Sequence, residues 1–192
     1  MELKQARAEI RGAEKALSRM KDAKTLEDLE DEWRHYLSAI EKIWIKTERS
    51  LVQNPKFQPW QGSYQRIRKK DSLLRYLKHA RNSDQHTIET LVETKPGKQE
   101  IKIEGPVAIS RLRIDKGQLL EYEGTKPLQI TITPERTELV PVKDSSKRYN
   151  PPFEHQGKPI TWPDPIMVAE LGLAFYKAYV DEAEKKFLKQ EN

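Results

Sequence analysis

Apolar residues recur along the N-terminal part of the chain at the alternating three- and four-residue spacing of an amphipathic helix. The first stretch, from about Glu2 to Lys21, carries the stripe Leu3, Ala6, Ile10, Ala13, Leu17 and Met20. A second stretch begins after Thr25, a typical N-cap residue with Asp28 three positions later. Its stripe consists of Leu26, Leu29, Trp33, Tyr36, Ile40, Ile43 and Thr47. Because only the short polar link 22–24 separates the two stripes, we expect an antiparallel helical hairpin.

Two further helical regions are expected. The third runs from about Gln61 to Ile88, and Asp71 within it either caps or kinks the helix. The final helix has a clear start, since Asp164 suits the N-cap and Pro165 the first helical position. The aromatic residues that fall on these apolar stripes are predicted to lie in the core: Trp33, Trp44, Phe175 and Tyr179.

Between the third and last helices the apolar period changes from helical spacing to alternation, as in Ile101 and Ile103. Asp115-Lys116-Gly117 is a hairpin-turn signal within this stretch. The sequence therefore predicts a mainly α protein, a four-helix bundle with a small antiparallel β-meander inserted before the last helix. We expect one domain, with a bundle of residues 1–96 and 163–192, a β-rich insertion 98–148 and a Pro-rich loop 149–163.

Composition excludes several classes of protein. There is no cysteine, so a disulfide scaffold, a thiolate zinc site and a cysteine nucleophile are ruled out. No apolar run approaches the roughly 18 residues that span a bilayer, and the charged N-terminus does not look like a signal peptide, so we expect a cytoplasmic protein without membrane contact. The four histidines lack metal-ligand spacing and no Gly-rich phosphate loop is present, so no metal and no cofactor are expected. The net charge of +5 permits a polyanionic partner.

The segment from Leu73 to His86 has the most informative pattern. His79, Asn82 and His86 are spaced i, i+3 and i+7, so they share one helix face, and Arg75 lies a further turn back. Arg81 lies about 140° from His86 around an ideal helix. The two side chains therefore meet only if the arginine curls or the helix end distorts.

Arg81-Asn82 followed by His86, late in the third helix of an expected bundle, resembles the signature of the HEPN superfamily (higher eukaryotes and prokaryotes nucleotide-binding). That signature is an arginine, four to six residues and a histidine, often with a polar residue after the arginine. The order of helices matches over most of the helical chain, whereas the β insertion departs from the minimal family pattern. The resemblance implies a metal-independent endoribonuclease that acts as a homodimer, with RNA as substrate.

The implied chemistry suits these residue types. The RNA 2′-OH attacks the adjacent phosphate and gives a 2′,3′-cyclic phosphate, a step that needs proton transfer and a cation to stabilise the added negative charge. Accordingly, His86 is expected to move protons and Arg81 to bind the phosphate. Asn82 is expected to orient His86 or to bind substrate. A toxin or defence effector, with a protein antitoxin or regulator as partner, fits such an activity.

Further basic and polar residues are candidate substrate contacts. Arg75 and His79 share the motif helix, and Arg66 and Lys70 belong to the basic run 66–70, which either steers RNA phosphates or is a solvated helix face. The same residues also permit a non-catalytic HEPN-like module that binds RNA or protein, or a helical interaction protein in which Arg81 pairs with Asp84 and His86 caps the helix. A second arginine-to-histidine spacing, from Arg148 to His155, falls in a Pro-rich segment and is set aside.

Overall fold

The computed structural model describes residues 3–86 and 90–188. Within these ranges the helices are α1 (Lys4–Asp22), α2 (Leu26–Leu51), α3 (Phe57–Lys70), α4 (Ser72–His86) and α5 (Pro165–Phe187). The strands are β1 (Val92–Lys95), β2 (Lys98–Lys102), β3 (Ile109–Asp115), β4 (Gln118–Gly124), β5 (Gln129–Thr133), β6 (Arg136–Leu139), β7 (Val142–Asp144), β8 (Lys147–Tyr149), β9 (Glu154–His155) and β10 (Lys158–Pro159). The chain divides into two compact units, Met1–Glu93 with Thr137–Asn192, and Thr94–Arg136.

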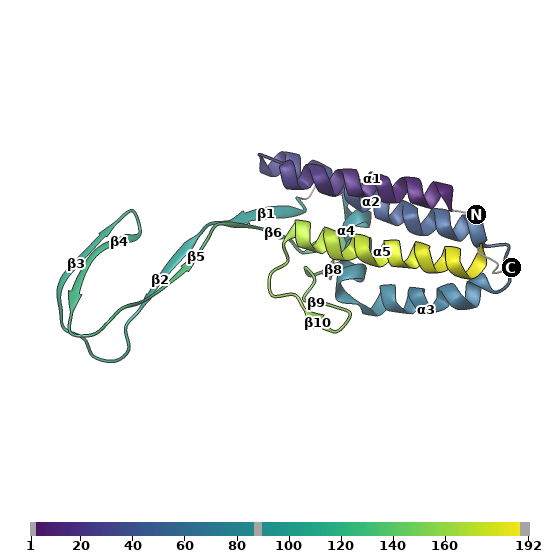
Figure 1. Ribbon diagram of the computed structural model, residues 1–192. Helices are drawn as coiled ribbons and strands as arrows, with labels where there is room; N and C mark the ends of the chain where they lie inside the picture. The colour runs from purple at the N-terminus through teal and green to yellow at the C-terminus, as the bar shows by residue number, and fades with distance from the viewer. Residues whose placement is uncertain (1–2, 87–89, 189–192) are drawn as a thin grey trace. The chain divides into compact units, whose positions relative to one another are not determined.

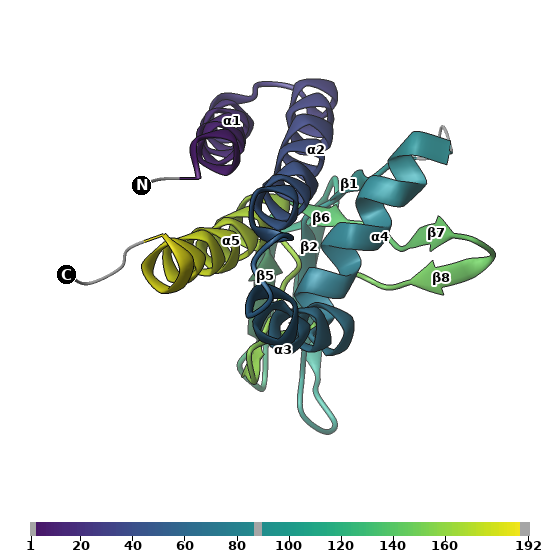
Figure 2. The ribbon, with the colours of Figure 1, turned by 90° about the vertical axis from the view of Figure 1, so that its right-hand side faces the viewer.

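The first unit is helical. Figure 1 shows α1, α2, α3 and α5 aligned along one direction, and Figure 2 shows α4 inclined across them. The expected hairpin of α1 and α2 is confirmed, and Thr25 caps α2 by accepting a hydrogen bond from the backbone N–H of Asp28 at 3.0 Å. The aromatic residues predicted for the core are all buried: Trp33, Trp44, Phe175 and Tyr179. The mainly helical character is therefore as predicted.

The expected third helix is two helices. Asp71 leaves the helical conformation, with φ −63° and ψ 127°, and ends α3. Its Oδ1 then accepts a hydrogen bond from the backbone N–H of Leu74 at 3.0 Å, so the same residue caps α4. Of the two alternatives for Asp71, capping is therefore the observed one. Residues 87 and 88, at the end of the expected helix, lie outside the described ranges.

Close approach of α5 to the rest of the helical unit depends on one glycine. A Cβ atom at Gly172 would lie 2.6 Å from Cδ1 of Leu77 and 2.8 Å from the hydroxyl oxygen of Tyr36. That hydroxyl donates a hydrogen bond of 2.7 Å to the carbonyl of Ala169. The N-terminus of α5 is as expected, since Asp164 accepts from the N–H of Met167 at 2.7 Å. This packing leaves α4 with one face against the helices and another available to the strands that follow.

The strands do not form the expected meander, in which each strand would pair with the next. They nest instead: β1 pairs with β6, β2 with β5 and β3 with β4, all as two-stranded sheets. Within the second unit, Gly105-Pro106 and Pro127 interrupt the two limbs of a single hairpin, because a proline lacks the N–H that a ladder requires. The turn at Lys116 and Gly117 is as predicted, with positive φ angles of 46° and 79°.

Two short hairpins follow in the helical unit. In β7–β8 the turn residues Ser145 and Ser146 have positive φ angles of 48° and 68°, and Asp144 pairs with Lys147 across the turn. The β9–β10 hairpin falls inside the expected Pro-rich loop 149–163. Among the described residues, no helix is long and apolar enough to cross a membrane.

Candidate functional site

One face of α4 carries three of the predicted site residues. Arg75, His79 and Asn82 follow each other at i, i+4 and i+7, so they lie along one side of the helix. The β7–β8 hairpin lies beside this helix (Figure 2) and contacts it through β7. His86 is the last residue of α4, and its side chain lies outside the described part of the chain. The predicted meeting of Arg81 and His86 is therefore still a prediction.

Asp144, at the end of β7, joins two of these side chains. Its Oδ2 atom lies 2.7 Å from Nδ1 of His79 and accepts a hydrogen bond of 2.9 Å from Nδ2 of Asn82. Its other oxygen accepts a 3.0 Å hydrogen bond from the hydroxyl of Ser145, the first turn residue. A strand end 65 residues away thus fixes the orientation of both the imidazole and the amide.

Arg81 continues this network on its far side. Its Nη1 donates to Oδ1 of Asn82 at 3.3 Å, so a chain of hydrogen bonds runs from His79 through Asp144 and Asn82 to Arg81. The Nε of Arg81 is buried and has no hydrogen-bond partner among the described residues. Asp84, the alternative partner for this arginine, instead forms an ion pair with Arg34 of α2. Among the described residues, Asn82 is thus the hydrogen-bond partner found for the Arg81 guanidinium, which has five N–H groups.

Electrostatics keeps the centre of the network charged. Hydrogen bonds from His79 and Asn82 lower the pKa of Asp144 from an ordinary 3.8 to about 2, so the carboxylate is ionised at neutral pH. An ionised carboxylate accepts hydrogen bonds but cannot donate them. Nδ1 of His79 therefore carries the proton, and Nε2 is the acceptor when the ring is neutral.

Tyr149 of β8 holds the same imidazole from its face. The two rings are stacked, with centroids 3.6 Å apart and planes inclined by 11°. The side chain of His79 is 19% exposed, and its Nε2 has no hydrogen-bond partner among the described residues. An imidazole oriented through Nδ1 and stacked on one face presents its second nitrogen to whatever binds at this surface.

A basic hollow adjoins Tyr149. It has a volume of about 280 Å³ and lies between α4 and the segment after β8. Arg75 and Arg148 both line it, and none of its described lining residues is acidic. Arginine forks fit phosphate oxygens, so the hollow has the size and the charge to take a phosphate group.

The basic run in α3 is divided. Arg66 and Lys70 are exposed, and neither forms a hydrogen bond or ion pair with the α4 network among the described residues. Arg68, between them, turns into the core, where it binds Glu41 at 2.6 Å and lies over the ring of Trp44. The structure therefore brings Arg75, His79, Arg81 and Asn82 together but does not join Arg66 or Lys70 to them.

No family model, curated protein or solved structure matches the chain. In the described ranges, no three His, Cys, Asp or Glu side chains gather where they could share a metal ion.

Three residues of the site were not predicted from sequence: Asp144, Arg148 and Tyr149. Asp144 and Arg148 lie at the end of the expected β-rich insertion 98–148, Tyr149 lies at the start of the expected Pro-rich loop, and the contacts of Asp144 with α4 cross more than 60 residues of chain. A local signal was nevertheless present. Asp144, Ser145 and Ser146 are residues that favour turns, and a hairpin turn gives its strand ends fixed positions.

Proposed function

We propose that the protein is a metal-independent endoribonuclease of the HEPN type, which cleaves RNA by attack of the 2′-OH on the adjacent phosphate. The observation that carries this proposal is the hydrogen-bonded chain from His79 through Asp144 and Asn82 to Arg81. It ends in the guanidinium of Arg81, whose partner among the described residues is Asn82, and runs beside a basic hollow of phosphate size.

In the proposed reaction, Arg81 stabilises the negative charge that develops on the phosphate oxygens in the transition state. His86, five residues further along the chain, transfers the protons of the attacking and leaving oxygens. Asn82 is engaged by Asp144 on one side and by Arg81 on the other, which supports a role in positioning Arg81 rather than His86. RNA is then required because DNA lacks the nucleophilic hydroxyl.

Substrate binding is proposed for the rest of the α4 face. Nε2 of His79 contacts the bound nucleotide, and Arg75 and Arg148 bind a neighbouring phosphate in the basic hollow. Arg66 and Lys70 contribute to a longer-range attraction of the RNA backbone, which is screened by salt. As in the family that the motif resembles, the active form is proposed to be a homodimer in which two such motifs face one cleft.

The test is cleavage of a mixed RNA pool in excess chelator, comparing the unmodified chain with His86→Ala. We expect cleavage with 2′,3′-cyclic phosphate ends by the unmodified chain, no cleavage of DNA of the same sequences, and loss of RNA cleavage in the variant. His35→Ala is the matched control, because His35 is an exposed histidine on α2 whose side chain is 65% accessible. Equal cleavage by the His86→Ala variant would remove His86 from the mechanism.

A non-catalytic RNA-binding module is the second candidate, and the acid-free hollow between Arg75 and Arg148 favours it. The binding module predicts RNA binding that weakens with salt, without cleavage by any variant.

Two further tests concern the proposed nuclease. If the nuclease is a toxin, its expression slows growth, and the Arg81→Ala substitution relieves the effect. Sedimentation of the purified chain at several concentrations tests the homodimer.

A further inference from the structure

A second aspartate–histidine pair lies at the start of α4. Nδ1 of His155, in β9, is 3.1 Å from both carboxylate oxygens of Asp71, and both residues are buried. Burial on its own raises the pKa of Asp71, but hydrogen bonds from His155 and from the N–H groups of Gln156 and Leu74 outweigh it and lower that pKa. Asp71 is thus a charged acceptor, and the proton of the neutral imidazole lies on Nδ1.

The second ring nitrogen of His155 is left to bind something else. Nε2 has no hydrogen-bond partner among the described residues. It is nevertheless accessible to solvent. The residue as a whole is only 8% exposed. An oriented, buried imidazole with an unpaired nitrogen at a surface opening is typical of a binding site rather than of a purely structural contact.

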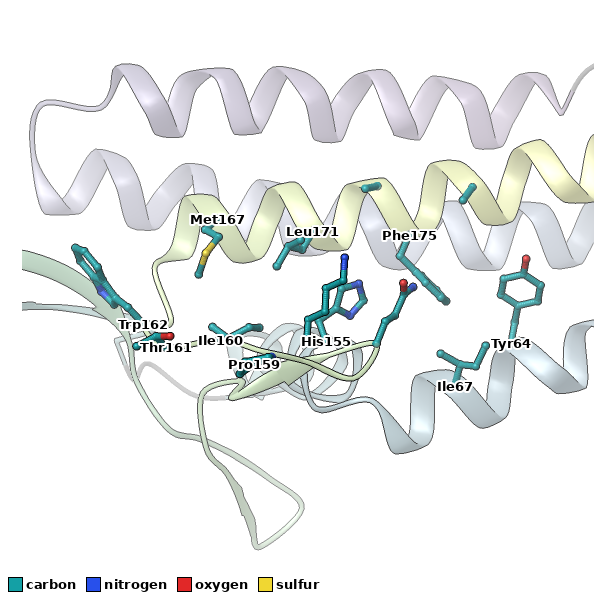
Figure 3. A pocket seen from close by; sticks show the side chains of 14 residues that line it. Tyr64, Ile67, His155, Pro159, Ile160, Thr161, Trp162, Met167, Leu171 and Phe175 are labelled. Carbon is teal, nitrogen blue, oxygen red and sulfur yellow. The ribbon is translucent and has the colours of Figure 1, made fainter.

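That opening is a cavity of about 780 Å³. Figure 3 shows Met167, Leu171 and Phe175 projecting into it from α5, with Tyr64 and Ile67 opposite them on α3. His155 and the residues after it, up to Trp162, lie along the remaining side. The walls are therefore mostly apolar and include several rings, and the volume is in the range of ligand sites for molecules of moderate size.

The hairpin turn adds a cation to this apolar space. Gln156 and Gly157 form a two-residue turn with positive φ angles of 50° and 76°, and His155 pairs with Lys158 across it. Directly paired residues of a hairpin have their side chains on the same face of the ribbon. Both residues line the cavity, and none of the described lining residues is acidic. Lys158 itself forms no ion pair within the described ranges.

We propose that this cavity binds a small organic acid with an aromatic body, an aryl carboxylate. The ring packs against Leu171 and Phe175, and the carboxylate lies between Lys158 and the doubly protonated imidazole of His155, for which Asp71 is the counter-ion. The cavity shares no lining residue with the RNA site, so this proposal does not depend on the proposed nuclease activity.

Isothermal titration with three naphthalene probes of equal shape and different charge tests the proposal. We expect 2-naphthoate to bind at least tenfold more tightly than 2-naphthalenemethanol, and 2-naphthylmethylammonium to bind more weakly still. Equal binding of the three probes, or no binding of the acid at millimolar concentration, would overturn the proposal.

Two substitutions locate the binding. Lys158→Gln, at an exposed position, should weaken naphthoate about tenfold, and Ala174→Phe, on the exposed cavity side of α5, should abolish binding by filling the space. Lys147→Gln is the matched control, since Lys147 holds the same position after the turn of the β7–β8 hairpin. Undiminished naphthoate binding in both cavity variants would place the acid elsewhere and refute the assignment.

Discussion

The molecule holds the same pair of side chains twice, in two different settings. In both His79–Asp144 and His155–Asp71, Nδ1 of the histidine faces a carboxylate and Nε2 has no partner in the described part of the chain. The first pair is joined to Asn82 and adjoins a basic hollow, whereas the second faces an apolar cavity. In each pair the carboxylate orients the imidazole, while the surroundings of Nε2 decide what that nitrogen can bind.

The two aspartates also differ in what they hold together. Asp71 caps α4 and accepts from the N–H of Gln156 at 2.8 Å as well as from His155, so it fixes a helix start and a hairpin. The carboxylate of Asp144 binds three side chains, those of His79, Asn82 and the turn residue Ser145. The first aspartate therefore stabilises the fold, and the second organises a surface.

The largest effect is expected from removing each carboxylate in turn. Asp71→Ala should lower the free energy of unfolding by about 3 kcal/mol, because it removes a helix cap and leaves buried donors unpaired. Asp144→Ala should lower it by about 1 kcal/mol, because the freed side chains reach water. Urea unfolding of both variants checks this order, and equal losses would remove the distinction between the two pairs.

A smaller effect is expected from pH. The pKa of Asp144 is lowered from 3.8 in the unfolded chain to about 2 in the folded protein, so its ionised form stabilises the fold above pH 4. That contribution is lost as pH falls from about 4 to 2. The difference in melting temperature between the unmodified chain and Asp144→Ala should shrink over this interval. A difference that stays constant down to pH 2 would contradict the lowered pKa.

The smallest effect concerns the basic hollow. Arg148→Ala should weaken RNA binding uniformly across sequences and reduce the slope of log affinity against log salt by about one, the effect of losing one phosphate contact. Fluorescence anisotropy with a labelled RNA at several salt concentrations measures both. Lys158→Gln is the control, since that cation lines the other cavity. An unchanged slope in Arg148→Ala would show that the hollow holds no phosphate.

Sequence reasoning succeeded where the signal was local. The stripes of α1 and α2, the caps at Thr25 and Asp164 and the turn at Gly117 all depend on neighbouring residues, and all were predicted. It failed where distant segments meet. Nothing near Asp144 in the chain indicates that it will bind His79, and nothing near Asp71 indicates His155, because these contacts follow from the packing of short hairpins on α4.

The nested pairing of the β unit was missed for a related reason. Alternating apolar residues predict strands but do not say which strands pair. Many of those apolar side chains remain exposed, Ile132 at 73% and Ile114 at 54%, because a two-stranded ribbon has no second layer to bury them. The need to bury apolar side chains therefore could not be used to predict which strands of the β unit pair, or in which register.

In the proposed nuclease, Arg81, held through Asn82 and Asp144, stabilises the transition state of RNA cleavage. The most direct test of this role is the rate at which Arg81→Ala forms 2′,3′-cyclic phosphate ends in excess chelator, with Arg11→Ala, an exposed arginine on α1, as the matched control. We predict a loss of about 100-fold or more in Arg81→Ala and an unchanged rate in the control. Cleavage by Arg81→Ala at the rate of the unmodified chain would contradict the account.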